Sequence, residues 1–431
     1  MPIFATEKRW SMSFADFILQ HEADDPVRLL LSRDRYPDVD IDLAVNTLEV
    51  RKKLRTKVPE WYAVPSLVYP FRLSGEQCSS SAAARYKARV ALRHTARNGG
   101  ILKVADLTGG MGVDAWAFAQ VAEEVLYNEM QVELVRATEL NFRELGIENV
   151  RFGNGRVEPG KVAEVLAGFE PDVIYLDPAR RAEDGKKVFL IEECRPDVLG
   201  LLPELFTASR YVLLKLSPMA DITMACKRLG AHAEEVHVVA AGGECKELLF
   251  LLDREWTGEY SLSVVENDAV LEIPGRAGND VPSLVMPGTA RESVISTGAK
   301  RSGEICLFEP GKALLKAGAF DLPCARFGLT KLGQHTHLYV GKTVPEELRP
   351  FGKVFEVLEV LPLNNQTMKE AGKRWPQAEV TARNVPMTSD LLRKKTGCAS
   401  GGDIHLFGVR VDAAAGAGNY LIVTQKRYGT D

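Results

Sequence analysis

Glycines and carboxylates stand at the ends of three apolar runs in the middle of the chain. These residues are the run Asp-Leu-Thr-Gly-Gly-Met-Gly at 106–112, Glu129, and Asp-Pro-Ala-Arg at 177–180. Glycines allow a backbone to pass close to a ligand and to adopt conformations closed to other residues. Carboxylates accept hydrogen bonds from hydroxyl and amine groups. The spacing therefore predicts a site for a small polar ligand, held by a backbone turn and by acidic side chains.

The segments that carry these groups alternate between short apolar runs and amphipathic stretches, which is typical of βαβ units. The predicted strands are residues 101–107, 124–128, 150–153, 173–176, 211–216, 235–240 and 247–252. The last two are joined through Ala241-Gly242-Gly243, a connection too short for a helix, so they must be antiparallel. The pattern predicts a doubly wound, mostly parallel α/β sheet with one reversed strand.

Open α/β sheets bind ligands outside the carboxyl ends of their strands, where the strand order switches. The glycine turn ends the first predicted strand, and the helix from Val113 begins there, so the N–H groups of its first turn face a ligand. Glu129 follows the second strand, where an acid can accept hydrogen bonds from ribose hydroxyls. Gly110 to Ala115 also match the dinucleotide fingerprint G-x-G-x-x-A. These features alone fit NAD as well as S-adenosylmethionine (SAM).

Asp177, Pro178 and Arg180 follow the fourth predicted strand. They favour SAM over NAD as the cofactor. A carboxylate at that position can hold an acceptor group beside the sulfonium methyl of SAM. Dehydrogenases have no recurring use for an Asp-Pro pair there. These three residues are therefore the candidate catalytic residues for methyl transfer. An NAD-dependent oxidoreductase stays open as the alternative that the fingerprint suggests.

The segments before and after the α/β region have different sequence patterns. Apolar residues recur at helical intervals in 14–20, 26–32 and 41–58, and hydroxyl caps precede a run of helix formers at 82–95. Strands dominate after residue 254, and a mixed region follows from about 308. We expect three parts, a helical region at 1–95, a ligand-binding α/β domain at 96–254 and an α+β region at 255–431.

The bulk composition constrains the compartment and the partners. The formal charge is −4, yet residues 301–431 hold 18 Lys and Arg against 13 Asp and Glu, which suits a polyanionic partner. The seven cysteines form no Cys-x-x-Cys pair and no cluster with histidines, so we expect no bound metal. We expect the cysteines to be reduced thiols. No apolar run reaches the roughly 20 residues of a membrane span. We expect a cytoplasmic protein with no membrane association.

The motifs at 106–112, 129 and 177–180 resemble those of class I SAM-dependent methyltransferases. The flanking segments that extend this match are Glu-Gln-Cys-Ser-Ser at 76–80, Arg-Tyr-Lys at 85–87, Phe-Gly-Leu-Thr-Lys-Leu at 327–332, His-Thr-His-Leu-Tyr at 335–339 and Gly-Gly-Asp-Ile-His-Leu-Phe at 401–407. Together they resemble bacterial methyltransferases that carry a C-terminal THUMP-like domain after a small ferredoxin-like piece. The resemblance implies a Rossmann-like, seven-stranded methyltransferase domain, a helical N-terminal region and a C-terminal α+β region.

The resemblance also implies a role for each residue of the cofactor site. The residues that would bind SAM are Asp106, Thr108, Gly109, Gly110, Gly112, Glu129, Met130 and Asn154. The turn would surround the methionine part, Glu129 would take the ribose, Met130 would pack on the adenine and Asn154 would contact the adenine edge. Many relatives have an aspartate where this chain has Asn154.

The residues around Asp-Pro leave the acceptor atom open. Methylation of a base amine commonly uses (Asp/Asn)-Pro-Pro-aromatic, whereas Ala179 and Arg180 stand here. Uridine carbon-5 methyltransferases need a cysteine after the fifth strand, where this chain has Ser217. A serine hydroxyl does not readily add to a pyrimidine ring. Direct transfer to a nitrogen or an oxygen, with Asp177 positioning the acceptor, is therefore favoured.

THUMP domains generally bind RNA, so the resemblance implies tRNA or rRNA as the substrate. The basic residues that could contact phosphates are Lys312, Lys316, Arg326, Lys331, His335, His337, Arg383, Arg393, Lys394 and Lys395. The departures at Ala179 and Asn154 keep one further alternative open, a SAM- and RNA-binding protein whose catalytic activity has decayed.

Overall fold

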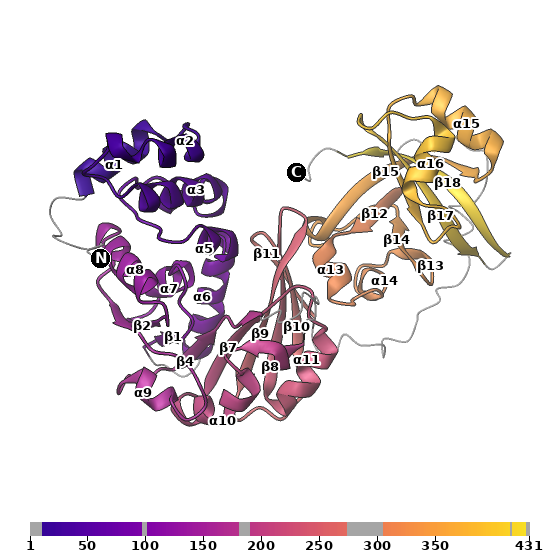
Figure 1. The fold of residues 1–431 in the computed structure, drawn as a ribbon. Helices are drawn as coiled ribbons and strands as arrows, with labels where there is room; N and C mark the ends of the chain where they lie inside the picture. The colour runs from indigo at the N-terminus through magenta and orange to yellow at the C-terminus, as the bar shows by residue number, and fades with distance from the viewer. Residues whose placement is uncertain (1–10, 97–100, 181–189, 274–304, 414–415, 428–431) are drawn as a thin grey trace. The chain divides into compact units, whose positions relative to one another are not determined.

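The computed structural model describes residues 11–96, 101–180, 190–273, 305–413 and 416–427 (Figure 1). The chain divides into two compact units, one made of residues 1–236 and 248–259, the other of residues 237–247 and 260–431. Across the described ranges, no helix combines the length and the apolar composition that crossing a bilayer requires.

The N-terminal part of the first unit is helical, as predicted. Its helices are α1 (Ser11–Gln20), α2 (Pro26–Leu31), α3 (Ile41–Lys57), α4 (Pro59–Tyr62), α5 (Arg72–Gln77) and α6 (Ser81–Ala96). Asp25 and Asp40 cap α2 and α3 by accepting hydrogen bonds from backbone N–H groups of the first turn. Phe17, Leu29 and Leu48 belong to the small apolar core that holds the first three helices together.

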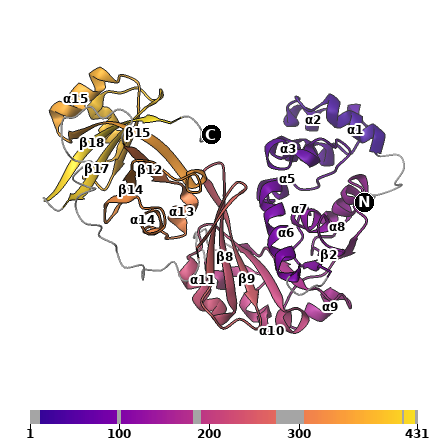
Figure 2. The ribbon, with the colours of Figure 1, turned by 180° about the vertical axis from the view of Figure 1, so that it is seen from behind.

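The sheet of the first unit is mostly parallel. Its parallel strands are β3 (Val150–Gly153), β2 (Glu124–Asn128), β1 (Lys103–Asp106), β4 (Val173–Leu176) and β7 (Tyr211–Leu216), in that order across the sheet. The strand β9 (Glu244–Asp253) pairs antiparallel with β7, and it forms a hairpin with β8 (Ala233–Ala241), seen as two long strands in Figure 2. The predicted α/β sheet with one reversed strand is therefore confirmed.

Helices connect the parallel strands, and the switch in strand order falls between β1 and β4. These helices are α7 (Val113–Ala119), α8 (Val132–Glu144), α9 (Val162–Leu166), α10 (Val198–Ala208) and α11 (Ile222–Leu229). Two short strands that the sequence did not predict, β5 (Ala179–Arg180) and β6 (Cys194–Arg195), pair antiparallel after β4. They fix the backbone immediately beyond Asp177.

The second unit contains a hairpin and a sheet of its own. The hairpin is β10 (Ser261–Glu266) with β11 (Ala269–Ile273). The strands of the sheet, in spatial order, are β13 (Thr330–Gly333), β14 (Thr336–Gly341), β12 (Cys306–Pro310), β15 (Gly352–Pro362), β18 (Gly416–Lys426), β17 (Ile404–Ala413) and β16 (Glu379–Arg383). All neighbours are antiparallel except β16 and β17, which are parallel.

This second sheet is apolar on both faces. Along β17, Leu406 packs towards α15 (Asn365–Arg374) and α16 (Ser389–Thr396), whereas its neighbour Phe407 belongs to the core on the opposite face. Successive side chains of a strand point to opposite faces, so each strand contributes to two cores. This unit also contains the short helices α13 (Lys312–Lys316) and α14 (Leu322–Ala325).

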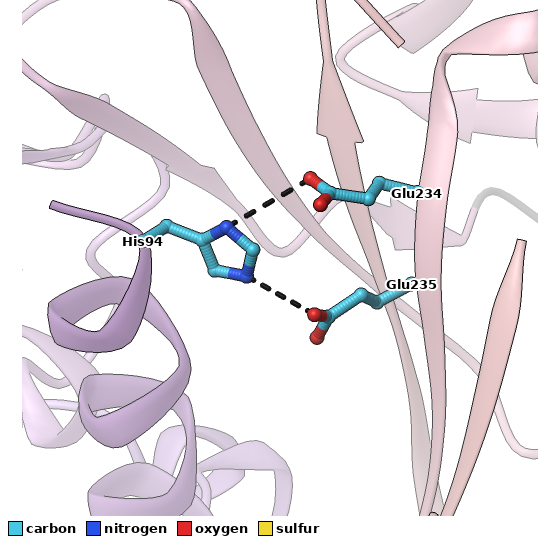
Figure 3. A group of neighbouring side chains, drawn as sticks. All are labelled: His94, Glu234 and Glu235. Atoms are coloured by element: carbon cyan, nitrogen blue, oxygen red, sulfur yellow. Dashed lines mark hydrogen bonds and ion pairs between the residues drawn. The ribbon is translucent and has the colours of Figure 1, made fainter. Parts of the chain in front are cut away.

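Within the first unit, a buried charged cluster fastens α6 to β8. His94 is 1% exposed and lies between Glu234 and Glu235 (Figure 3). Its Nδ1 is 3.8 Å from Glu234 Oε2 and its Nε2 is 3.2 Å from Glu235 Oε1, while Arg93 also pairs with Glu235. The two carboxylates face different ring nitrogens. The cluster is therefore best described as a pair of buried contacts that hold a helix to a strand.

We expect His94→Leu to lower the free energy of unfolding by about 3 kcal/mol, because two carboxylates lose the imidazole between them. Urea unfolding followed by tryptophan fluorescence measures the change, since Trp61, Trp116 and Trp256 all lie in the first unit. The matched control is His335→Leu at an exposed histidine of the second unit, which should change stability by less than about 0.5 kcal/mol. Equal effects of the two substitutions would contradict the assigned role.

Candidate functional site

The glycine turn follows β1 and ends at Gly112, which precedes α7. Gly110 has φ +54° and Gly112 has φ +91°, a region that favours glycine. A Cβ on Gly109 would lie 2.2 Å from the Tyr127 ring, and one on Gly112 would lie 2.5 Å from Thr138 Cγ2. A Cβ on Gly110 would approach nothing closer than 3.9 Å. Gly109 and Gly112 are therefore needed for packing, whereas the backbone at Gly110 borders open space that a ligand can use.

Two residues at the end of β2 hold the turn in shape. The Tyr127 hydroxyl donates to the carbonyl oxygen of Gly110 at 2.6 Å. The Asn128 amide donates to the carbonyl oxygens of Leu107 at 3.1 Å and Gly155 at 2.9 Å, so it ties the turn to the loop after β3. The sequence did not single out either residue. The available signal was a pair of polar groups at the end of an otherwise apolar strand.

Glu129 and Asn154, both predicted cofactor residues, lie together beside the turn. The Glu129 carboxylate accepts hydrogen bonds from the backbone N–H groups of Gly110 at 3.0 Å and Gln131 at 2.9 Å. The Asn154 amide donates to the carbonyl oxygen of Glu129 at 2.7 Å. Met130 is 56% exposed, which is high for an apolar side chain and leaves it available to a ring. A nucleoside bound here could contact the fixed carboxylate of Glu129 and the apolar side chain of Met130.

Asp106 ends β1 and is fully buried. Its Oδ1 accepts a hydrogen bond from the N–H of Thr108 at 3.1 Å. Its Oδ2 is buried and has no hydrogen-bond partner among the described residues. Burial first, and then the charge of Asp114, hold the pKa of Asp106 well above its usual range.

Asp177 faces the same edge of the sheet from the end of β4. Its backbone N–H donates to Thr108 Oγ1 at 2.6 Å, so Asp177 is bonded to the glycine turn. Lys215 Nζ, from β7, lies 2.5 Å from Asp177 Oδ2. The Asp177 side chain is 34% exposed, and its Oδ1 has no partner among the described residues. One carboxylate oxygen is thus anchored and the other is available to an acceptor.

The remaining predicted catalytic residues adjoin Asp177. Pro178 is buried. The backbone of Arg180 pairs with Cys194 in the β5–β6 ribbon, whereas its side chain lies outside the described part of the structure. The site also includes Lys215, through its pairing with Asp177.

A buried polar network lies beneath the turn and joins it to α6. Lys87 is fully buried, its Nζ is 3.0 Å from Asp114 Oδ1, and it donates to Ser79 Oγ at 2.8 Å. The Ser79 and Tyr175 hydroxyls donate to Asp114 Oδ2 at 2.9 and 3.0 Å. Burial opposes ionisation of Asp114, but the ammonium groups of Lys87 and Lys215 outweigh it, so the pKa of Asp114 is lowered. Ser79 and Lys87 fall in the flanking segments 76–80 and 85–87, whose role the sequence did not indicate.

Several basic residues predicted to contact phosphates are engaged within the second unit. Arg326 pairs with Glu347, Arg383 lies 3.0 Å from Glu309, and Arg393 lies 3.1 Å from Glu379. Lys394 and Lys395 are exposed in the last turn of α16. Such residues would position a phosphate backbone and would not specify its sequence.

Two family matches cover most of the second unit's sheet. Residues 307–348, which include β14 and the helices α13 and α14, match the ferredoxin-like domain family. Residues 352–426, from β15 to β18, match the THUMP domain-like family.

A solved structure resembles the chain along nearly its whole length. It is that of a methyltransferase candidate from Porphyromonas gingivalis W83, which is 29% identical, with 98% of this chain and 100% of that chain covered and a TM-score of 0.76. The chain has the fold of a methyltransferase with a C-terminal THUMP-like domain. The predicted family resemblance and fold class are confirmed.

One curated relative adds sequence similarity in a shorter segment. An uncharacterized RNA methyltransferase from Enterococcus faecalis is 34% identical over 94 residues. The match covers 22% of this chain and 21% of the relative, so the chain spans about a fifth of that protein's length.

We expect Lys87→Met to destabilise the protein by about 3–5 kcal/mol at pH 7, because Asp114 stays buried beneath the turn without its ammonium partner. A lowered pKa means that ionised Asp114 stabilises the fold above its ordinary pKa of 3.8, and that this contribution is lost as the pH falls. The substitution raises the pKa of Asp114. The difference in stability between the two proteins should therefore shrink from pH 7 to pH 4 in urea unfolding.

The matched control is Lys52→Met, since Lys52 forms an exposed ion pair with Glu49 on α3. Exposed pairs contribute about 0–1 kcal/mol, so this change should be small at both pH values. A Lys87→Met deficit that stays constant from pH 7 to pH 4 would show that Lys87 acts through packing alone.

Proposed function

We propose that this chain is a SAM-dependent methyltransferase that modifies RNA, tRNA or rRNA, by direct transfer to a nitrogen or an oxygen. The observation that carries the proposal is the convergence of three groups at the carboxyl ends of the parallel strands. Gly110 borders open space, Glu129 presents a fixed carboxylate, and Asp177 is anchored by Lys215. The parts that this proposal assigns are a helical region at 1–95, a SAM-binding domain at 96–254 and an α+β region at 255–431.

The residues present fit the cofactor. SAM supplies an activated methyl group on a sulfonium centre. Asp106, Thr108, Gly109, Gly110 and Gly112 would surround its methionine part, and the open space at Gly110 supports this. The three residues that would hold the nucleoside are Glu129, Met130 and Asn154.

Asp177 would position the acceptor. Lys215 fixes one carboxylate oxygen and Thr108 fixes the backbone, so Oδ1 can accept a hydrogen bond from an N–H or O–H of the acceptor. Orientation of this kind removes much of the entropic barrier of a two-substrate reaction. Because transfer to such an atom needs no protein nucleophile, Ser217 in place of a cysteine is compatible with it.

The RNA substrate is supported by the THUMP-like match, by the name of the Enterococcus relative and by the exposed pair Lys394 and Lys395. We also propose that the protein acts in the cytoplasm. All seven cysteines lie in the described ranges as free thiols, as expected in a reducing compartment.

We expect RNA from a deletion strain to lack one methylated nucleoside in mass spectrometry. A plasmid copy of the wild-type gene should restore it, and an Asp177→Ala copy should not. Asp177→Ala should leave SAM affinity within several-fold, because the residue touches the acceptor side of the site. An unchanged nucleoside profile in the deletion strain would refute the RNA methyltransferase, and full restoration by Asp177→Ala would refute the role of Asp177.

We expect Gly110→Val to abolish SAM binding, because a branched side chain would fill the space that the ligand needs. The matched control is Gly146→Val, at a second positive-φ glycine, φ +69°, whose Cβ would meet nothing within 4 Å. Both substitutions cause backbone strain of similar kind, but Gly146 follows α8, away from the turn. Calorimetric titration with S-adenosylhomocysteine measures the difference, and tight binding by Gly110→Val would place the cofactor elsewhere.

A further inference from the structure

Asp106 is unusual among the acids at the carboxyl edge of the first sheet. Glu129 accepts two backbone N–H groups, Asp114 is paired with Lys87, and Asp177 is paired with Lys215. Asp106 receives one backbone N–H on Oδ1, and its Oδ2 has no hydrogen-bond partner in the described part of the chain. It is also completely buried.

The charges that face Asp106 are mostly of its own sign. Asp114 from α7, Asp177 after β4 and Glu129 after β2 all raise its pKa, in addition to the larger effect of burial. The nearby cations, Lys87 and Lys215, are each bonded to one of those other acids. An ionised carboxylate in this place would be desolvated, surrounded by like charges and incompletely hydrogen-bonded, which is unfavourable.

We propose that Asp106 carries a proton on Oδ2 in the ligand-free protein, and that binding of the cationic methionine ammonium of SAM at the glycine turn releases this proton to the solvent. The inference rests on the proposed cofactor site. The neutral carboxylic acid becomes a carboxylate, the ammonium stays charged, and one proton passes to the buffer. A positive charge at the turn favours the ionised form of a nearby acid.

Proton release makes the affinity for the ligand depend on pH with a definite sign. When binding expels a proton, the association constant rises with pH, by up to tenfold per pH unit where Asp106 is fully protonated. A ligand that lacks the methionine ammonium should show no such slope. The coupling between ligand binding and proton release thus depends on the charges around the glycine turn. It can be detected without measuring methyl transfer.

The test is calorimetric titration of the full-length protein with S-adenosylhomocysteine at pH 6.5, in phosphate and in imidazole, whose ionisation enthalpies differ. The wild type should release a net fraction of a proton per ligand, seen as a buffer-dependent binding enthalpy. The Asp106→Asn protein should bind S-adenosylhomocysteine and release almost no proton. The matched control Asp268→Asn, at an exposed aspartate between β10 and β11, should release as much as the wild type.

A second ligand protects the test against an Asp106→Asn protein that fails to fold. Adenosine lacks the ammonium, so it should bind the wild type with a buffer-independent enthalpy and a flat pH profile. Release of a proton by adenosine, or by Asp106→Asn with S-adenosylhomocysteine, would overturn the inference. Tight binding of S-adenosylhomocysteine with no proton release would overturn it and leave the proposed function standing, whereas no binding at all would overturn both.

Discussion

The buried ion pair between Lys87 and Asp114 is the interaction on which the rest of the first unit depends. Removing two charges from water is costly, and the pair is tolerated because Ser79 and Tyr175 supply further hydrogen bonds. Lys87 lies on α6, Asp114 lies in the first turn of α7, and Tyr175 lies on β4. The network therefore fixes the start of the helix that follows the glycine turn, and it does so from a region that the strand pattern alone would leave outside the domain.

The turn itself is shaped before any ligand arrives. Tyr127 and Asn128 bond its backbone from β2, and Thr108 joins it to the N–H of Asp177 at the end of β4. Glu129 and Asp177, which follow β2 and β4, are thus both bonded to a turn whose backbone is fixed. Preorganisation of this kind is what transfer between two bound substrates requires, since the reacting groups must be aligned within small tolerances.

The sequence predicted the elements of the first sheet well because apolar runs and glycine turns are local patterns. Strands β1 to β4, β7 and the β8–β9 hairpin follow from apolar runs, and the turn at 106–112 follows from its glycines. The role of Lys87 could not be predicted, because its partner Asp114 is separated from it along the chain and only the packing of α6 on α7 brings them together. The β5–β6 ribbon was missed because two-residue strands carry no periodic signal. The domain boundaries and the roles of the site residues remain predictions.

The position of β18 in the second sheet has a consequence for biosynthesis. This strand, the last of the described elements, lies between β15 and β17, so it connects the two halves of the sheet. On a ribosome the ferredoxin-like half and the β16–β17 pair are made first, but neither can complete its pairing until β18 has emerged. Until then two strands expose unpaired edges, which are prone to association with other chains. The two halves of this sheet are therefore joined only once β18 has been synthesised.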